Sequence, residues 1–265
     1  MQQRRPLICG NWKLHHSVAQ SRCVIRQLQQ LLPPTPMHIV VAPVAVALES
    51  SCRIANRSQA VAIAAQNVFY APQGAFTGEW SALHLRELGC RFALVGHSER
   101  RHLFAESDTA VAQKARACLQ QRITPIVCMG ESLPQQQQGQ TQAVLAAQLT
   151  PLLHALSPRQ AAQLVVAYEP IWAIGSGQAA QPQQIQQIFT FVRQLIQQLQ
   201  SSTVAQQLRL LYGGSVSPQS AAAFMQQPHV DGLLVGGASL QPHTFVDLVK
   251  QAHRGWLAAT ACRPQ

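Results

Sequence analysis

The chain has 265 residues, 47% of them hydrophobic, so it can bury a sizeable core and is not a disordered polypeptide. Charged residues make up only 11% of the chain, and 39 glutamines occupy many of the polar positions. The formal net charge of +10 arises from 20 Lys and Arg against 10 carboxylates. Because the basic residues are scattered, we expect the protein to attract small anions in general and to have no nucleic-acid partner.

Cysteine usage indicates a cytoplasmic protein. The seven cysteines are scattered, and none forms a Cys-x-x-Cys pair. This pattern is typical of reduced thiols, so we expect neither a disulfide framework nor a zinc ribbon. No uninterrupted apolar run of about 18 residues occurs, and we therefore expect no membrane partner.

Short apolar runs rich in β-branched residues recur along the whole chain, and we predict a strand at each of them. In chain order they are Leu7–Cys9, His38–Ala42, Val61–Ala65, Phe92–Val95, Ile123–Val127, Leu164–Ala167, Arg209–Leu211 and Gly232–Val235. Between these runs, apolar residues at steps of three and four predict amphipathic helices. The predicted helices are Val18–Leu31, Ala105–Gln120, Thr141–Leu156, Gln183–Gln200, Pro218–Met225 and Thr244–Leu257.

The alternation of apolar strands with amphipathic helices predicts an α/β protein with a parallel sheet covered by helices. Eight such strands in 265 residues favour a (β/α)8 barrel, with an open doubly wound sheet as the alternative. No composition shift, long linker or internal repeat divides the chain. We therefore expect residues 1–265 to form a single domain.

Chemistry in both of these folds lies just beyond the carboxyl ends of the strands. Asn11–Lys13 follows the first predicted strand, His97–Glu99 the fourth and Glu169 the sixth. Glycine-rich turns follow the seventh and eighth strands, at Gly213–Ser215 and Gly236–Gly237. We expect a lysine, a histidine and a carboxylate to meet at one rim, beside turns whose backbone a ligand can approach closely. The chain has only three lysines, so the position of Lys13 at this rim indicates a functional role for it.

These segments resemble the triosephosphate isomerase family over essentially the whole chain. The resemblance is carried by Asn11–Lys13, Ala65–Asn67, Gly74–Glu79, Gly96–Arg101, Ala167–Gly177, Tyr212–Ser215 and Asp231–Leu240. It implies an eight-stranded barrel enzyme that interconverts dihydroxyacetone phosphate and glyceraldehyde 3-phosphate. Triose phosphates would be its small-molecule partners, and it would need neither a metal nor an organic cofactor.

The resemblance also implies the catalytic roles. Glu169 would be the base, His97 the electrophile that polarises the substrate oxygens, and Lys13 a fixed positive charge for the enediolate and the phosphate. Exclusion of water would raise the pKa of Glu169. A helix that begins at Ser98 and Glu99 would support His97 and keep its imidazole neutral.

Residues around the substrate follow from the same resemblance. Asn11 would be a neutral donor, whereas Trp12 would mainly pack, with its backbone in the same substrate-facing turn. The implied phosphate donors are Gly175, Ser215, Gly236 and Gly237. The implied mobile lid, which keeps water from the intermediate, is Pro170, Ile171, Trp172, Ala173, Ile174, Gly175, Ser176 and Gly177. Ile174 and Leu234 would press on the base and desolvate it.

The connection Gln66–Glu79 is long for a barrel and resembles the loop through which subunits of the family interlock. In a monomer it would expose an apolar cluster of Phe69, Tyr70 and Phe76. We therefore expect a two-fold homodimer in which Phe76 lies in the interface and Thr77 reaches the Asn11–Lys13 turn of a second copy.

The chain also departs from the family pattern. His15-His16 replaces the usual Asn-Gly of a tight turn, and Ser176 and Gln178 alter the far end of the lid. A histidine at position 16 would carry a cost if that position needs a positive φ. None of these changes removes an acid, a base or a phosphate donor. A phosphate-binding barrel with a secondary, non-catalytic role stays the alternative function.

Overall fold

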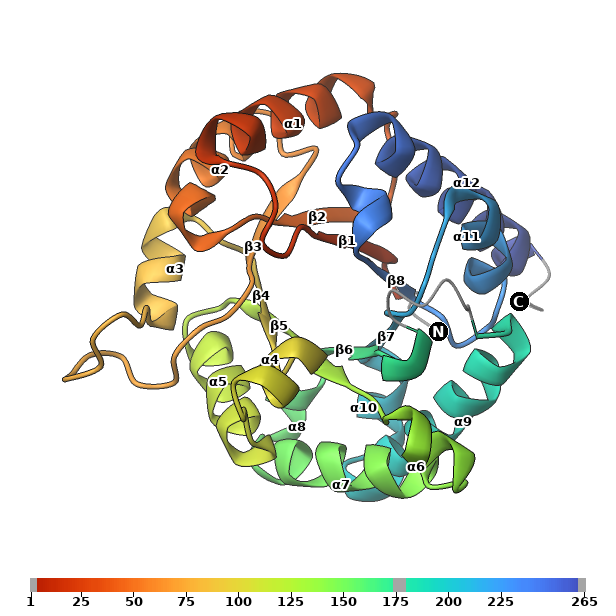
Figure 1. Cartoon of the computed structure of the whole chain (residues 1–265). Coiled ribbons are helices and arrows are strands. Elements are labelled where there is room, and N and C mark those ends of the chain that lie inside the picture. Colours follow the sequence, from red (N-terminus) through yellow and green to blue (C-terminus); the bar gives the residue numbers. More distant parts are fainter. Residues whose placement is uncertain (1–3, 174–179, 262–265) are drawn as a thin grey trace.

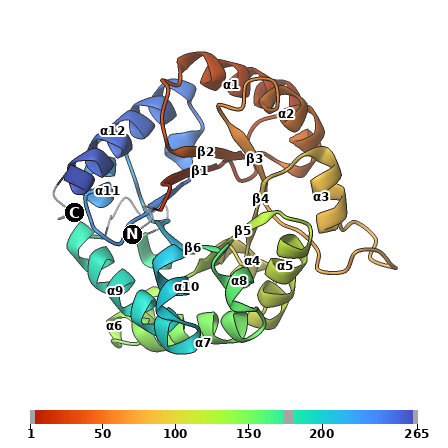
Figure 2. The same ribbon diagram turned by 180° about the vertical axis from the view of Figure 1, so that it is seen from behind.

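The computed structural model describes residues 4–173 and 180–261 of the chain. Eight parallel strands close into a barrel in sequence order, and a ring of helices surrounds it (Figures 1 and 2). The strands are β1 (Leu7–Asn11), β2 (His38–Ala42), β3 (Ala62–Ala65), β4 (Phe92–Val95), β5 (Thr124–Met129), β6 (Val165–Tyr168), β7 (Arg209–Tyr212) and β8 (Gly232–Val235). The predicted (β/α)8 barrel is confirmed, and the open sheet is wrong.

Side chains of alternate strand residues fill the barrel interior, because successive residues of a strand point to opposite faces. Leu7 and Cys9 of β1 belong to this inner cluster, whereas Ile8 belongs to the larger core between the sheet and the helices. Both faces of the sheet are therefore buried, which explains why the strands are continuous apolar runs in the sequence.

The helices of the described residues lie outside the barrel (Figure 1). The longer ones are α1 (Val18–Leu31), α2 (Leu48–Ala55), α5 (Asp108–Gln120), α7 (Thr141–His154), α9 (Pro182–Leu199), α11 (Pro218–Met225) and α12 (Pro242–Ala261). The shorter ones are α3 (Ala82–Leu88), α4 (Ser98–Leu103), α6 (Leu133–Gln137), α8 (Pro158–Ala161) and α10 (Ser202–Gln207), with 3₁₀ turns η1 (Ala45–Ala47), η2 (Ile171–Ala173) and η3 (Gly237–Ser239). Among the described residues, none of these helices is long and apolar enough to cross a membrane.

Every predicted helix is present, although some boundaries differ. The predicted helix from Ala105 begins instead at Asp108, because Ala105 has a φ of +52° and Ser107 caps the helix by accepting the N–H of Ala110. Apart from the start of α4, the short helices were not predicted, and neither was α2, since a helix of one or two turns carries too few residues for a periodic pattern.

The connection between β3 and α3 projects away from the barrel (Figures 1 and 2). Its aromatic side chains contact one another: the ring centroids of Phe69 and Tyr70 are 4.3 Å apart, and those of Phe69 and Phe76 are 4.5 Å apart. Tyr70 and Phe76 are nevertheless 39% and 42% exposed in this single chain. The expected exposed apolar cluster is therefore present.

The close contact of α11 with α12 depends on Gly255. A Cβ atom at this position would lie 2.3 Å from the carbonyl oxygen of Ala222 and 2.8 Å from its Cα. We expect Gly255→Ala to destabilise the protein by about 1–3 kcal/mol through overpacking, which exceeds the gain of about 1 kcal/mol in helix propensity. Urea denaturation of both proteins measures the difference, and a more stable variant would contradict this packing.

Candidate active site

A cavity of about 640 Å³ lies beyond the carboxyl ends of the strands. Of the residues predicted for the site, it is lined by Asn11, Lys13, His97, Glu169, Ser215, Leu234, Gly236 and Gly237. Gly213 and Gly214 of the predicted glycine-rich turn also line it. Lining residues to which sequence reasoning gave no place at the site are His15, Val216, Ser217, Ser220, Ala238 and Leu240. The predicted convergence of lysine, histidine and carboxylate is present in the described structure.

The backbone of Lys13 is held in an unusual conformation. Its φ is +50°, a left-handed value that costs an ordinary residue roughly 1–2 kcal/mol. The side-chain oxygen of Asn11 accepts the N–H of Lys13 at 3.0 Å, and the side-chain amide of Gln66 donates to the carbonyls of Lys13 and Ala42, each at 2.8 Å. Asn11 is the last residue of β1, so the strand itself positions this turn. Gln66 had no predicted role because its partners lie far away in sequence.

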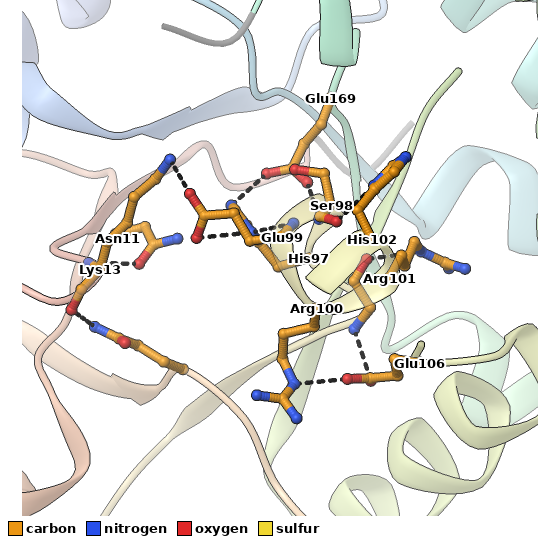
Figure 3. Close-up of polar contacts among 12 residues, drawn as sticks. Asn11, Lys13, His97, Ser98, Glu99, Arg100, Arg101, His102, Glu106 and Glu169 are labelled. Carbon is orange, nitrogen blue, oxygen red and sulfur yellow. Dashed lines mark hydrogen bonds and ion pairs between the residues drawn. The ribbon is translucent and has the colours of Figure 1, made fainter. Parts of the chain in front are cut away.

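The side chain of Lys13 points across the cavity toward α4 (Figure 3). Its Nζ lies 2.6 Å from Oε1 of Glu99, with both side chains partly exposed. Such an ion pair adds little stability, but it orients the ammonium group over the site. Ser98 and Glu99 are the first residues of α4, as predicted.

Glu169 lies directly after β6 and is only 2% exposed. Its Oε1 is 3.0 Å from Nε2 of His97, and its Oε2 accepts the N–H of Ser98 at 3.1 Å (Figure 3). Two glycines leave room for Glu169. A Cβ atom on Gly213 would lie 2.8 Å from Cγ of Glu169, and a Cβ atom on Gly130 would lie 1.8 Å from the carbonyl oxygen of Glu169. Sequence reasoning read Gly213 only as part of a turn.

His97 is 5% exposed and occupies the N-cap of α4. Its Nδ1 accepts the backbone N–H of Glu99 at 3.2 Å. A ring nitrogen that accepts a hydrogen bond carries no proton, so the geometry assigns the ring proton to Nε2, which donates to Glu169. A second proton on Nδ1 would require this N-cap bond to break.

The charges of the site oppose the effect of burial. Burial raises the pKa of Glu169, but the charge and hydrogen bond of His97, the N–H of Ser98 and the charge of Lys13 bring the pKa below its ordinary value. Burial lowers the pKa of His97, but Glu169 and then Glu99 raise it above its ordinary value. The raised pKa expected for Glu169 is therefore wrong for this arrangement, because the contact with His97 outweighs desolvation. The neutral imidazole in catalysis stays a prediction.

Trp12 packs in the core, and its side chain does not line the cavity. It is fully buried, and its Nε1 donates to the carbonyl of Ser239 at 3.2 Å. The expected packing role of the Trp12 side chain is thus confirmed, and its bond to Ser239 joins the turn after the first strand to η3; a contact of its backbone with substrate stays a prediction. His16, in the same turn, has a φ of +67°, so the histidine does occupy a left-handed position.

The two glycine turns border the cavity from β7 and β8. Gly236 is the N-cap of η3, and a Cβ on Gly237 would meet no atom within 4 Å. The Ser215 hydroxyl donates to the carbonyl of Ala173 at 2.8 Å. Gly175, the remaining predicted phosphate donor, lies outside the described residues.

The predicted lid is described from Pro170 to Ala173, whereas its members Ile174, Gly175, Ser176 and Gly177 lie outside the described residues. The Tyr168 hydroxyl and the Trp172 ring N–H both donate to Oε1 of the buried Glu131, each at 2.9 Å. The N–H of Ile171 donates to the carbonyl of Glu131 at 3.1 Å. Sequence reasoning missed Glu131 because no motif contains it.

No group of three or more His, Cys, Asp and Glu side chains within residues 4–173 and 180–261 could hold a metal ion. The residues that line the cavity include an ionisable pair, Glu169 and His97, beside the cation of Lys13, and such a set can carry out acid–base chemistry. The fold and site together define a (β/α)8 barrel with an acid–base centre at the carboxyl ends of its strands.

The comparisons with known proteins identify the family. The model of the triosephosphate isomerase family matches residues 6–252. A triosephosphate isomerase from Pelobacter propionicus is 43% identical over 247 residues, and one from Syntrophotalea carbinolica is 44% identical over 248 residues; each alignment covers 93% of this chain and 98% of the relative. One from Moorella thermoacetica is 41% identical over 246 residues, again 93% and 98% of the two chains. This chain belongs to the triosephosphate isomerase family.

The contact between Glu169 and His97 has a testable electrostatic consequence. We expect Glu169→Gln to lower the pKa of His97, because it removes the carboxylate that contributes most to raising that pKa. The matched change Glu99→Gln should lower it less, since the Glu99 carboxylate is 3.6 Å from Nδ1 and 44% exposed. NMR titration of the imidazole measures both effects, and a larger shift in Glu99→Gln would contradict the assigned pairing.

Proposed function

We propose that this chain, as a single domain, interconverts dihydroxyacetone phosphate and D-glyceraldehyde 3-phosphate by base-catalysed proton transfer through an enediolate. The observation that carries the proposal is the buried contact of Glu169 with His97 in a cavity that Lys13 also lines. The names of the family and of its relatives support the same activity. A coupled assay with purified protein and glyceraldehyde 3-phosphate tests it directly. No turnover in that assay would leave only the phosphate-binding alternative.

Glu169 is proposed to move the proton between the two adjacent carbons of the substrate. To reach a carbon-bound proton, its carboxylate must exchange the contacts with His97 and the N–H of Ser98 for the substrate. Burial remains after this exchange, so the pKa of Glu169 then rises and the carboxylate becomes a stronger base. The base is thus held as a carboxylate before substrate binds and strengthened when the substrate displaces its partners.

His97 and Lys13 are proposed to stabilise the charge that develops on the substrate oxygens. The Nε2–H of His97 points into the site, because the N-cap bond to Nδ1 leaves the proton on the other nitrogen. The Lys13 ammonium supplies a positive charge whose backbone is already fixed, so little reorganisation is needed during the reaction. Asn11 would add a neutral donor from the end of β1.

The phosphate would lie against Gly236, Gly237 and Ser215, with Gly175 from the lid as a further donor. Two observations support this position. A Cβ added at Gly237 would meet no atom within 4 Å, and a Cβ added at Gly236 would lie 3.8 Å from Cε of Lys13. The lid residues Pro170 to Gly177 are proposed to close over the intermediate and exclude water, with Leu234 and Ile174 against the base.

Shortening the base should slow the chemistry more than it weakens binding. Glu169→Asp withdraws the carboxylate by about one methylene length, and we expect kcat to fall roughly 100-fold or more with little change in KM. Steady-state kinetics measure both constants. Glu87→Asp, an exposed position on α3, is the matched control and should retain full activity. Similar turnover in the two variants would remove Glu169 from the role of base.

Filling the space at Gly236 should weaken binding of the phosphate. A valine there would occupy the space between the backbone and Lys13, whereas an alanine would reach only ordinary contact. We expect Gly236→Val to raise the KM for glyceraldehyde 3-phosphate and the inhibition constant for inorganic phosphate, with a smaller effect of Gly236→Ala. Unchanged phosphate inhibition in the valine variant would place the phosphate elsewhere.

The chain is further proposed to act in the cytoplasm as a two-fold homodimer. The support is the projecting β3–α3 connection, which holds the half-exposed Phe76 and the exposed Thr77 (Figure 2). Burial of this apolar cluster against a second copy would remove it from water. Thr77 of that copy would then support the Asn11–Lys13 turn.

A charge on this loop should separate the dimer and lower activity together. We expect Phe76→Asp to give a monomer by light scattering and a reduced kcat, because Lys13 would lose its support. Leu257→Asp places the same charge at an exposed apolar position of α12 and should leave the assembly unchanged. A fully active Phe76→Asp monomer would show that the loop does not support the site.

A further inference from the structure

A second hollow lies on the outside of the barrel between α1 and α2, apart from the candidate active site. Its volume is about 310 Å³, and it shares no lining residue with the larger cavity. Four arginines line it, Arg22 and Arg26 from α1 and Arg53 and Arg57 from α2 and the turn after it, together with one carboxylate, Glu49. Four positive charges therefore surround one small hollow and face a single negative charge.

Most of this positive charge is not neutralised by neighbouring groups. Arg53 forms an ion pair with Glu49 one helical turn earlier in α2. Within the described part of the chain, no hydrogen bond or ion pair is recorded for the side chains of Arg22, Arg26 and Arg57, and all three residues are exposed. Three guanidinium groups are thus free to bind an anion at the same place.

The helix dipole explains the positions of only two of the four arginines. Arg53 and Arg57 lie at the carboxyl end of α2, where positive charge is favourable. Arg22 and Arg26 lie within α1, four residues apart, where like charges repel, and the helix contains no acidic residue in its first turn to offset them. Elsewhere this chain usually places glutamine on exposed helix positions, as α1 does at Gln20, Gln27 and Gln30. An anion in the hollow would relieve this repulsion.

We propose that this hollow is a non-catalytic binding site for a small anion that carries two phosphate groups. Guanidinium groups form paired, charge-assisted hydrogen bonds with phosphate oxygens, and arginine suits this geometry better than lysine does. One phosphate group would match the α1 pair, and the second would match the arginines of α2. The volume is at the lower end of the range of small-molecule sites, which favours a compact ligand over a large one.

Calorimetric titration with inorganic pyrophosphate in low-salt buffer tests this site. We expect the full chain to bind pyrophosphate more tightly than orthophosphate, and R22Q/R26Q to lose about tenfold or more in pyrophosphate affinity. The matched control is R116Q/R159Q, which removes the same charge from exposed arginines on other parts of the ring of helices. The control should bind as the unmodified chain does. Any pyrophosphate bound in the larger cavity contributes equally to all three proteins.

Further measurements separate this site from the proposed isomerase activity. We expect kcat and KM for glyceraldehyde 3-phosphate to be the same in R22Q/R26Q as in the unmodified chain. A loss of pyrophosphate binding can therefore be distinguished from a loss of isomerase activity. R57Q, in the turn after α2, should also weaken pyrophosphate binding. This variant tests the site independently if R22Q/R26Q does not fold.

Three results would overturn the proposal. Equal losses in R22Q/R26Q and R116Q/R159Q would show that only the net charge attracts the anion. Orthophosphate binding as tightly as pyrophosphate would exclude a site for two phosphate groups. If a single-stranded oligonucleotide bound more tightly than pyrophosphate and this binding were lost in R22Q/R26Q, the arginines would form a site for a polymeric anion.

Discussion

Closure of the barrel between β8 and β1 is the constraint on which the candidate site depends. The two strands pair with Leu7 opposite Gly232, and a Cβ on Gly232 would lie 1.8 Å from the carbonyl oxygen of Leu7. Only a residue without a side chain allows the strands to come this close. The closure brings the turn at Lys13 beside Gly236, although these residues are far apart in the sequence. Trp12 strengthens the junction through its bond to Ser239.

A network of buried charges holds the fourth strand end in place around His97. Oε1 of Glu106 accepts the N–H of Gly96 at 3.2 Å, and its other oxygen is 2.6 Å from Nε of Arg100 (Figure 3). Lys114, one of only three lysines, is also buried, 3.2 Å from Glu106 and 2.8 Å from the side-chain oxygen of Asn67. Buried charges are costly unless they are paired, so this network ties β3, β4 and α5 into one arrangement.

At the rim of the candidate active site, hydrogen-bond donors alternate with carboxylates in a row from Lys13 through Glu99 and His97 to Glu169 (Figure 3). Each group stabilises the ionised or polar form of the next, which explains why the pKa of Glu169 is lowered despite burial. A substrate that enters the row must replace some of these contacts. The proposed reaction uses that replacement, because the base strengthens when His97 turns from the carboxylate to the substrate oxygens.

The sequence by itself determined the alternation of strands and helices, favoured a barrel, and placed Lys13, His97 and Glu169 beyond strand ends. These follow from local information: the period of apolar residues defines strands and helices, and parallel strands place their carboxyl ends at one rim. The roles of the three residues were implied by the resemblance to the family. Local information did not reveal most of the short helices, which carry too few residues for a periodic pattern.

Tertiary structure alone decided which groups support the site and in which direction its pKa values move. Gln66 holds Lys13 across 53 positions of sequence, and Glu131 holds Trp172 across 41. Gln66 stands in one of the segments that resemble the family and Glu131 in none, but no local feature of either residue shows which group it holds. The pKa of Glu169 depends on the balance of burial against three neighbours, and each of those effects varies with distance. Distances between remote residues exist only once the barrel has closed, and for that reason the sequence could place Glu169 and His97 at one rim but could not show their direct contact.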